Sequence, residues 1–221
     1  MARIARVVAP GYPHHITQRG NRRQDTFFCD EDYRLYLRLM AKWCSFHEVA
    51  IWAYCLMPNH VHLVLVPQTE GSLRLAIGEA HRRYTRHINF RENWRGHLWQ
   101  GRFSSYVMDE KYLLAAARYA ELNPVRARLA ADPGSYPWSS AGAHLKGVDD
   151  GLVAVEPLLS LVGDWRTFLA GGLPEEECEK IRRHERTGRP LGNVKFTEKL
   201  ECGTGRILTP RKGGRPKKQR N

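Results

Sequence analysis

The chain has 221 residues, of which 42% are hydrophobic, and its mean hydropathy is −0.52. These values indicate a soluble globular protein with one sizeable core. No apolar run reaches the roughly 18 to 20 residues that cross a bilayer, and the N-terminal segment lacks the apolar stretch of a signal peptide. A membrane partner is therefore not expected, and the cytoplasm is the expected location.

Charge is the most informative global property of the sequence. There are 35 Lys and Arg residues against 23 Asp and Glu, a net charge of +12, and the pI is near 9.8. Residues 174–221 hold 14 of the basic and 7 of the acidic residues, so their net charge of +7 is more than half of the total. Because a basic surface concentrates polyanions, nucleic acid is the leading partner.

The chain has five cysteines, an odd number, and no two of them are spaced as CxxC. They are Cys29, Cys44, Cys55, Cys178 and Cys202. Neither a disulfide framework nor a four-thiolate zinc site is expected, so the thiols are interpreted as reduced.

Hydrophobic spacing and turn residues predict a series of elements up to Pro124. In chain order they are a strand, a helix, two strands, a helix, a strand and a helix, at residues 14–18, 30–47, 49–57, 61–66, 72–88, 97–108 and 109–122. Asp30 and Ser72 are the expected N-caps of the first two helices, and Pro124 is expected to end the third. The order is that of the ferredoxin-like split βαβ fold with an added helix, an α+β architecture with an antiparallel sheet.

Beyond this core the sequence predicts a turn-rich segment at 132–138 that folds back over it, followed by a small helical basic extension. Two short helices are expected at 174–186 and 194–201, separated by residues 187–190. Residues 209–221 contain too few apolar side chains to pack and are expected to be disordered when free.

His60 and His62 stand at the start of a predicted strand. Alternate residues of a strand point to the same face, so the two imidazoles lie side by side and make half of a divalent-metal site. A packing or hydrogen-bonding pair is the open alternative. His14 and His15 are interpreted as structural, with one of them buried and the other exposed.

Tyr119 lies one helical turn before Asn123, on the same face of the predicted helix. A phenol can attack phosphate when a nearby cation stabilises the phenolate, and an amide oxygen can complete the coordination of a metal. A core or rim position for the tyrosine is the alternative.

Five ordered motifs closely resemble the REP-associated tyrosine transposases, which belong to the His-hydrophobe-His (HUH) single-strand endonucleases. The resemblance covers about residues 10–145, with motifs at 15–21, 57–65, 98–103, 118–127 and 136–140. It implies the HUH version of the ferredoxin-like fold, in which His60 and His62 bind the metal and Tyr119 is the nucleophile. Asn123 falls where related enzymes place a third metal ligand.

The same resemblance implies the chemistry and the substrate. Mg²⁺ or Mn²⁺ is the expected cofactor, with no organic cofactor. The tyrosine is expected to cut single-stranded DNA near a hairpin and to form a 5'-phosphotyrosine intermediate from which strands are rejoined. Residues 1–145 are then the catalytic domain, 146–173 a connector, 174–205 a small helical DNA-contacting segment and 206–221 a disordered basic tail. A monomer and a homodimer both remain open.

Basic and aromatic residues interleave along the motifs, as a surface for single-stranded DNA requires. The candidates for nucleic-acid contact are Arg19, Arg22, Arg23, Arg82, Arg83, Arg86, Trp99, Arg102, Phe103 and Arg215. Trp94 and Arg95 belong to the same pattern. The alternative is that the aromatic residues are core and the arginines a solvated face. Arg215 lies in a Gly-Arg-Pro triplet that resembles the minor-groove AT-hook, with a nonspecific basic tail as the alternative.

The expected function is that of a DNA transposase, or site-specific single-strand endonuclease, acting on hairpin-forming repeats. Two alternatives remain: a catalytically silent relative that only binds repeat hairpins, and a metal-dependent RNA-processing enzyme. The intact set of His60, His62, Tyr119 and Asn123 favours the active transposase. An RNA-processing function would explain the basic surface but would give Tyr119 no role.

Overall fold

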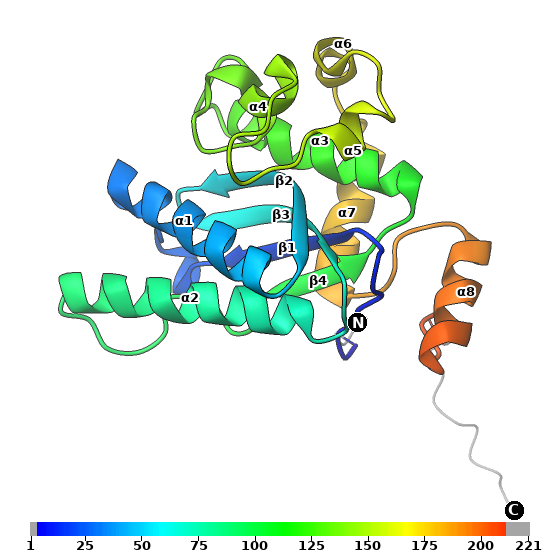
Figure 1. Ribbon diagram of the computed structural model, residues 1–221, viewed down its shortest axis with the longest axis horizontal. Helices are drawn as coiled ribbons and strands as arrows, with labels where there is room; N and C mark the ends of the chain where they lie inside the picture. Colours follow the sequence, from blue (N-terminus) through cyan, green and yellow to red (C-terminus); the bar gives the residue numbers. More distant parts are fainter. Residues whose placement is uncertain (1–3, 211–221) are drawn as a thin grey trace, which may run out of the picture.

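Apolar runs of alternating and continuous pattern fold into a central antiparallel sheet (Figure 1). In the computed structural model, which describes residues 4–210, its strands are β1 (His14–Arg19), β2 (Val49–Met57), β3 (His60–Pro67) and β4 (Ser104–Val107). The order across the sheet is β2-β3-β1-β4, and each neighbouring pair is antiparallel. This arrangement confirms the α+β, ferredoxin-like architecture expected from the order of the elements.

The last strand is shorter than the sequence predicts. The expected strand covered 97–108, whereas β4 begins only at Ser104. Before it, Gly101 adopts a left-handed φ of 65°, and Trp99 pairs with Gly20 only through an isolated bridge. A left-handed residue turns the chain out of the extended conformation, which explains the loss of regular pairing.

One face of the sheet is covered by α1 (Asp30–Phe46) and α2 (Ser72–Arg91), which pack against each other (Figure 1). Their buried side chains join those of Ile16 in β1 and Leu63 in β3 in the main core cluster. The burial of this apolar area supplies most of the stabilising free energy of such a layer.

The predicted N-caps of these two helices are each wrong by one residue. Cys29 and Gly71 occupy the cap positions, so Asp30 and Ser72 are the first helical residues. No side chain caps α1. The carboxylate of Asp32 instead accepts a hydrogen bond at 2.8 Å from the backbone N–H of Phe28, which precedes the cap residue, and this bond fixes the segment that leads into the helix.

The opposite face of the sheet is covered by α3 (Glu110–Arg126). The sequence predicts Asp109 as its first residue, whereas Asp109 is its N-cap and accepts a hydrogen bond from the backbone N–H of Tyr112 at 3.1 Å. The prediction that Pro124 ends this helix is wrong, since Pro124 lies inside its last turn. A proline removes only its own N–H donor, and its fixed φ near −65° is itself helical, so the turn continues to Arg126.

Residues between α3 and the C-terminal helices form a layer of short helices that packs over α3. Its elements are η2 (Pro133–Ser135), α4 (Ala141–Lys146), α5 (Glu156–Leu159) and α6 (Trp165–Ala170). Leu158, Trp165 and Leu169 are buried in the same cluster as the inner side of α3. The layer therefore holds in place the helix that carries Tyr119 (Figure 1).

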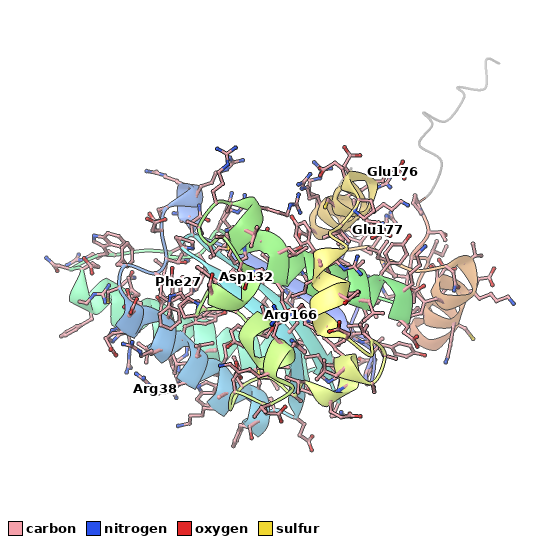
Figure 2. All side chains as sticks on the ribbon, turned by 90° about the horizontal axis from the view of Figure 1, so that it is seen from above. Phe27, Arg38, Asp132, Arg166, Glu176 and Glu177 are labelled. Atoms are coloured by element: carbon pink, nitrogen blue, oxygen red, sulfur yellow. The ribbon has the colours of Figure 1, made fainter. Side chains whose placement is uncertain are left out.

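The two C-terminal helices are α7 (Glu175–Thr187) and α8 (Val194–Thr204), close to the predicted ranges. α7 packs against β4, β1 and α3, and Ile181 is buried in the α3 cluster. Glu176 lies at its exposed outer end (Figure 2). α8 packs instead on the N-terminal segment, where Leu200 meets Val7. α7 thus packs against the sheet and α3, whereas α8 contacts the N-terminal segment.

The expectation of a disordered tail from residue 206 is not met for residues 206–210. Arg206 donates hydrogen bonds to the carbonyl groups of Ala5 and Arg6 at 2.7 and 2.9 Å, and Leu208 is buried. Arg215 and its AT-hook-like triplet lie outside the described residues. Over residues 4–210, no helix combines the length and the apolar character that a membrane span requires.

Candidate functional site

The alternation of side chains along β3 directs His60 and His62 to the face of the sheet that α3 covers. His62 pairs in register with Thr17 of β1, so His15, two residues earlier on that strand, shares this face. His15 is 0% and His62 3% exposed, whereas His60 is only half-buried at the end of its strand. The expectation that one of His14 and His15 is exposed is wrong, since both are fully buried.

His15, His62 and Glu185 form a close cluster, named here the His-His-Glu cluster. Nδ1 of His62 lies 3.2 Å from Nε2 of His15, and the two rings stack with their centroids 5.3 Å apart. Oε1 of Glu185, on α7, lies 3.7 Å from Nδ1 of His15 and 3.8 Å from Nδ1 of His62. One potential ligand atom from each residue lies within 4.8 Å of the others, a spacing that a single metal ion can bridge.

The chemistry of these donors fits a divalent cation. Nδ1 of His15 and Oε1 of Glu185 are buried without a hydrogen-bond partner. An unsatisfied buried polar atom costs about 1–3 kcal/mol, and a bound cation would offset that cost. Two imidazole nitrogens and one carboxylate oxygen suit Mn²⁺ better than Mg²⁺, which prefers oxygen ligands throughout.

Burial sets the protonation of the cluster. It lowers the pKa of His15 to about 3 and that of His60 to about 4, and it holds the pKa of His62 well below its usual range. The imidazoles are therefore neutral at pH 7, which is the form that binds metals. Burial also raises the pKa of Glu185 to about 7, against the opposing effect of Arg19 and other nearby arginines.

Tyr119 faces the same cluster from α3. Its ring meets that of His62 edge-on, with the centroids 5.4 Å apart and the planes at 80°. Arg182 of α7 hydrogen-bonds the phenolic oxygen, and the guanidinium of Arg126 lies 5.2 Å from the centre of the ring. Burial, then the charge of Glu185, raises the pKa of Tyr119, while the two arginines lower it. The phenol is protonated at neutral pH, with two cations placed to stabilise the phenolate.

The other predicted metal ligands lie beside this cluster. The ring of His60 lies 5.0 Å from that of His62, and its Nδ1 is 2.6 Å from Oδ1 of Asn59. Asn123 is half-buried one turn after the tyrosine on α3, and its Nδ2 is buried without a hydrogen-bond partner. The predicted ligand set of His60, His62 and Asn123 thus shares only His62 with the His-His-Glu cluster.

The predicted arginines of the first loop lie next to the site. Arg19 is exposed at the end of β1, in register with His60, and its charge lowers the pKa of that histidine. Arg22 and Arg23 are exposed in the following turn, η1 (Asn21–Arg23), and both adopt a left-handed φ.

The predicted arginines of α2 lie on the other side of the sheet from Tyr119. Arg82 and Arg83 pair with Glu79 at 2.8 and 3.4 Å, and Arg86 is exposed one turn later. The sheet therefore separates these side chains from Tyr119.

Trp99 and Phe103 belong to the core, which corrects the expectation that they offer stacking faces to DNA. Each is 7% exposed. Trp99 stacks on His81 with the centroids 4.6 Å apart, and the guanidinium of Arg6 lies 3.5 Å from the centre of the Phe103 ring. The neighbouring Arg102 is exposed, in the irregular segment before β4.

Sequence reasoning missed three residues of the site: His15, Arg182 and Glu185. From the sequence His15 is interpreted as structural, although it stands in one of the ordered motifs. Arg182 and Glu185 are three residues apart, so they share one face of α7. Only the packing of α7 against β4 and α3 brings that face to Tyr119, and no local spacing predicts this contact.

Known proteins share both the sequence pattern and the fold. The family model described as "Transposase IS200 like" matches residues 10–123, more than half of the chain. A solved REP-associated tyrosine transposase bound to a REP hairpin is 19% identical with a TM-score of 0.58, over 70% of this chain and 92% of that chain. A putative transposase from Deinococcus radiodurans is 19% identical with a TM-score of 0.38, over 57% and 92% of the two chains. No curated protein matches the chain.

Proposed function

The chain belongs to the IS200-like transposase family, and we propose that it cleaves and rejoins single-stranded DNA beside a hairpin through Tyr119. The observation that carries the proposal is the position of the Tyr119 ring against His62, with Arg182 at the phenolic oxygen. The similar REP-associated transposase is bound to a hairpin, which supports hairpin DNA as the substrate class.

In the proposed reaction the phenolic oxygen of Tyr119 forms a bond to the phosphorus of the scissile phosphodiester. The bond from that phosphorus to the 3' oxygen breaks, the phenolic proton leaves, and the departing oxygen takes up a proton. The products are a free 3'-hydroxyl and a 5'-phosphotyrosine. Because one phosphodiester has replaced another, a 3'-hydroxyl can reverse the attack and join strands without ATP.

The residues around the phenol have separate tasks in this proposal. Arg182 and Arg126 stabilise the phenolate as it develops, because both lower the pKa of Tyr119. His15, His62 and Glu185 hold the divalent cation, with His60 and Asn123 as the alternative partners of His62. When bound, that cation would withdraw charge from a non-bridging oxygen of the phosphate in the transition state.

Basic side chains along α7, from its exposed side to Arg182 beside the phenol, support a path for the DNA backbone toward Tyr119. Lys180, Arg182, Arg183 and Arg186 line a groove of about 600 Å³ along this helix, together with the glutamates of its outer side, such as Glu176 (Figure 2). Because arginine and lysine contacts to phosphates release counterions, binding along this groove weakens steeply as salt is raised.

The test is covalent trapping on single-stranded hairpin oligonucleotides taken from the repeats that flank the gene, labelled at the 3' end. The unchanged protein and Tyr112→Phe, a matched change on the same helix, should give a slower band on a denaturing gel in Mn²⁺ and not in EDTA. Tyr119→Phe should give none. An adduct that persists in Tyr119→Phe overturns the role of the phenol. Tight hairpin binding without an adduct in any lane identifies a catalytically silent binder.

The metal donors are tested without reference to activity, by titrating Mn²⁺ into the protein and following the free ion by electron paramagnetic resonance. Changing His15 to Ala or Glu185 to Gln should weaken binding by about tenfold or more, the usual effect of losing a ligand or its support. Loss of affinity in His60→Ala and Asn123→Ala, with no change in the first two variants, would instead support the set predicted from the resemblance.

A further inference from the structure

The guanidinium groups of Arg126 and Arg182 meet at one carboxylate beside Tyr119, that of Glu175, and these two arginines and the glutamate are named here the Arg-Glu-Arg cluster. Nη1 of Arg182 donates a hydrogen bond to Oε1 of Glu175 at 2.6 Å. Nη2 of Arg126 lies 3.6 Å from Oε2 of the same carboxylate. Arg126 belongs to the last turn of α3 and the other two residues to α7, so the cluster joins the two helices next to the phenol.

Each arginine of the cluster is also held by a group other than the carboxylate. Arg182 hydrogen-bonds the phenolic oxygen of Tyr119. Nη1 of Arg126 donates to Sγ of Cys178, which is buried, at 3.1 Å. The guanidinium of Arg126 also lies 5.2 Å from the centre of the Tyr119 ring. Both guanidinium groups therefore keep a contact that holds them beside the phenol when the carboxylate of Glu175 leaves.

Glu175 is the most exposed member of the cluster. Its side chain is 64% exposed, against 32% for Arg126 and 42% for Arg182. An ion pair at this exposure contributes little to stability, because water and salt screen it and because two long side chains must be held in one geometry. A competing anion can therefore displace the carboxylate from the two arginines at small cost.

A phosphate of a DNA backbone matches the place of this carboxylate. Arginine binds carboxylate and phosphate groups with the same planar fork of N–H donors, and a phosphodiester carries one negative charge, as the carboxylate does. A guanidinium has five N–H donors, so the contacts to Tyr119 and Cys178 leave donors for a further anion. Arg182 also lines the groove along α7, so a backbone that follows this groove reaches the cluster.

We propose that the Arg-Glu-Arg cluster is a phosphate-binding site in which the carboxylate of Glu175 occupies the place of a backbone phosphate next to the cut. When the strand binds, that phosphate replaces the carboxylate between Arg126 and Arg182, and Glu175 turns to the solvent. This proposal rests on the proposed function for its ligand. Because the carboxylate competes with the phosphate for the same donors and repels it, removing its charge strengthens DNA binding, whereas a residue that only positioned the arginines would weaken binding when changed.

The test measures hairpin binding by fluorescence anisotropy in the Tyr119→Phe background, so that affinity is measured without cleavage. Hairpins with a single-stranded flank are made with an uncharged methylphosphonate in place of one phosphate, which is moved along the flank one position at a time. Glu175→Gln should bind the fully charged hairpin about five- to tenfold more tightly, because a unit charge a few ångströms from another changes affinity by about that factor at a protein surface. At one position, next to the cut mapped by covalent trapping, the methylphosphonate should abolish this gain.

Two further variants separate the cluster from the general charge of the surface. Glu176→Gln is the matched control, because Glu176 is the next residue of α7, is exposed and lines the same groove (Figure 2). It removes the same charge outside the cluster, so any change in affinity should be the same at every methylphosphonate position. In Arg126→Gln one half of the phosphate site is missing, so the gain from Glu175→Gln should disappear.

The outcomes separate this site from the cleavage function. Weaker or unchanged binding by Glu175→Gln overturns the proposal, and so does a gain that persists in Arg126→Gln or at every methylphosphonate position. If covalent trapping fails while one position still abolishes the gain, the cleavage function is refuted and the phosphate site is retained. Normal trapping without such a position refutes the phosphate site alone. Misfolding does not produce the expected result, because a misfolded variant loses affinity.

Discussion

Replacing Glu121 should destabilise the protein more than any change on the surface of the same helix. The Glu121 side chain is 0% exposed on α3. Its carboxylate accepts hydrogen bonds from Oγ of Ser140 at 2.5 Å, Nδ1 of His144 at 2.7 Å and Nε1 of Trp165 at 2.8 Å. These donors come from the layer of short helices over α3, so one side chain ties that layer to the helix of Tyr119.

The magnitude follows from the number and kind of these bonds. A hydrogen bond to a charged group is worth about 1.5–3 kcal/mol. Removing one member of a buried charged network costs about 3–5 kcal/mol, because the groups that were bonded to it stay buried without a partner. Glu121→Ala should therefore lower the free energy of unfolding by about 3–5 kcal/mol. Domains of this kind are stable by only about 5–15 kcal/mol, so the variant should be close to its folding limit.

The assay is equilibrium unfolding in urea at pH 7, with Glu110→Ala as the control on the same helix. Glu110 is exposed in the first turn of α3, and its contribution through the helix dipole is at most about 1 kcal/mol. Limited proteolysis should also cut Glu121→Ala faster between α4 and α6. The reasoning is refuted if the loss of stability in Glu121→Ala does not exceed that in Glu110→Ala.

The remaining predictions concern acid stability, a loop and the nucleophile. Burial lowers the pKa of His81 to about 3. Between pH 6.5 and that value this histidine is protonated in the unfolded chain but not in the folded chain, so it lowers the free energy of unfolding by about 1.4 kcal/mol for each pH unit of acidification. The buried histidines His15 and His60 contribute slopes of the same sign, so His81→Gln should lower the total slope in urea unfolding between pH 6.5 and 5 by about 1.4 kcal/mol per pH unit, and an unchanged slope would contradict it. Gly20→Ala should cost about 1–3 kcal/mol, because a Cβ there would lie 2.1 Å from the carbonyl oxygen of Gln24, and wild-type stability in urea would show the loop to be looser than described. Arg182→Gln should slow adduct formation at Tyr119 about 10- to 100-fold in single-turnover assays, because the loss of one charged hydrogen bond in the transition state has about that effect on a rate. An unchanged rate would show that Arg182 does not act in the reaction.

Local sequence patterns account for the fold because each element has a signal within its own residues. The alternation in β3 places His60 and His62 on one face, and Asp109 is an acceptor at the position where α3 needs a cap. The boundaries fail where a local rule has an exception. Pro124 is tolerated in the last turn of a helix, and Gly101 leaves the extended conformation before β4.

Local sequence patterns predict only some residues of the candidate site. The spacing of His62 from its partner histidine and the position of Tyr119 on a helix are local, and the ring contact between them follows from the packing of α3 on the sheet. Glu185 lies far along the chain, and only tertiary packing brings it to His15. Burial cannot be predicted from the local sequence either. Trp99 and Trp94 both stand among arginines, yet Trp99 is buried in the core and Trp94 is exposed at the surface.

The route by which α7 reaches the candidate site has a consequence for the point during synthesis at which that site becomes complete. The hydroxyl of Ser104 donates to the carbonyl of Glu185, and the N–H of Ile4 donates to the carbonyl of Thr187 at 3.0 Å, so α7 is held by segments made much earlier. Because chains fold from the N-terminus as they leave the ribosome, the sheet and α3 can form before Arg182 and Glu185 emerge. A nascent chain in which α3 and Tyr119 are already folded therefore still lacks Arg182 and Glu185 of the candidate site. A messenger RNA that is cut before the codons of α7 yields a core without these two residues.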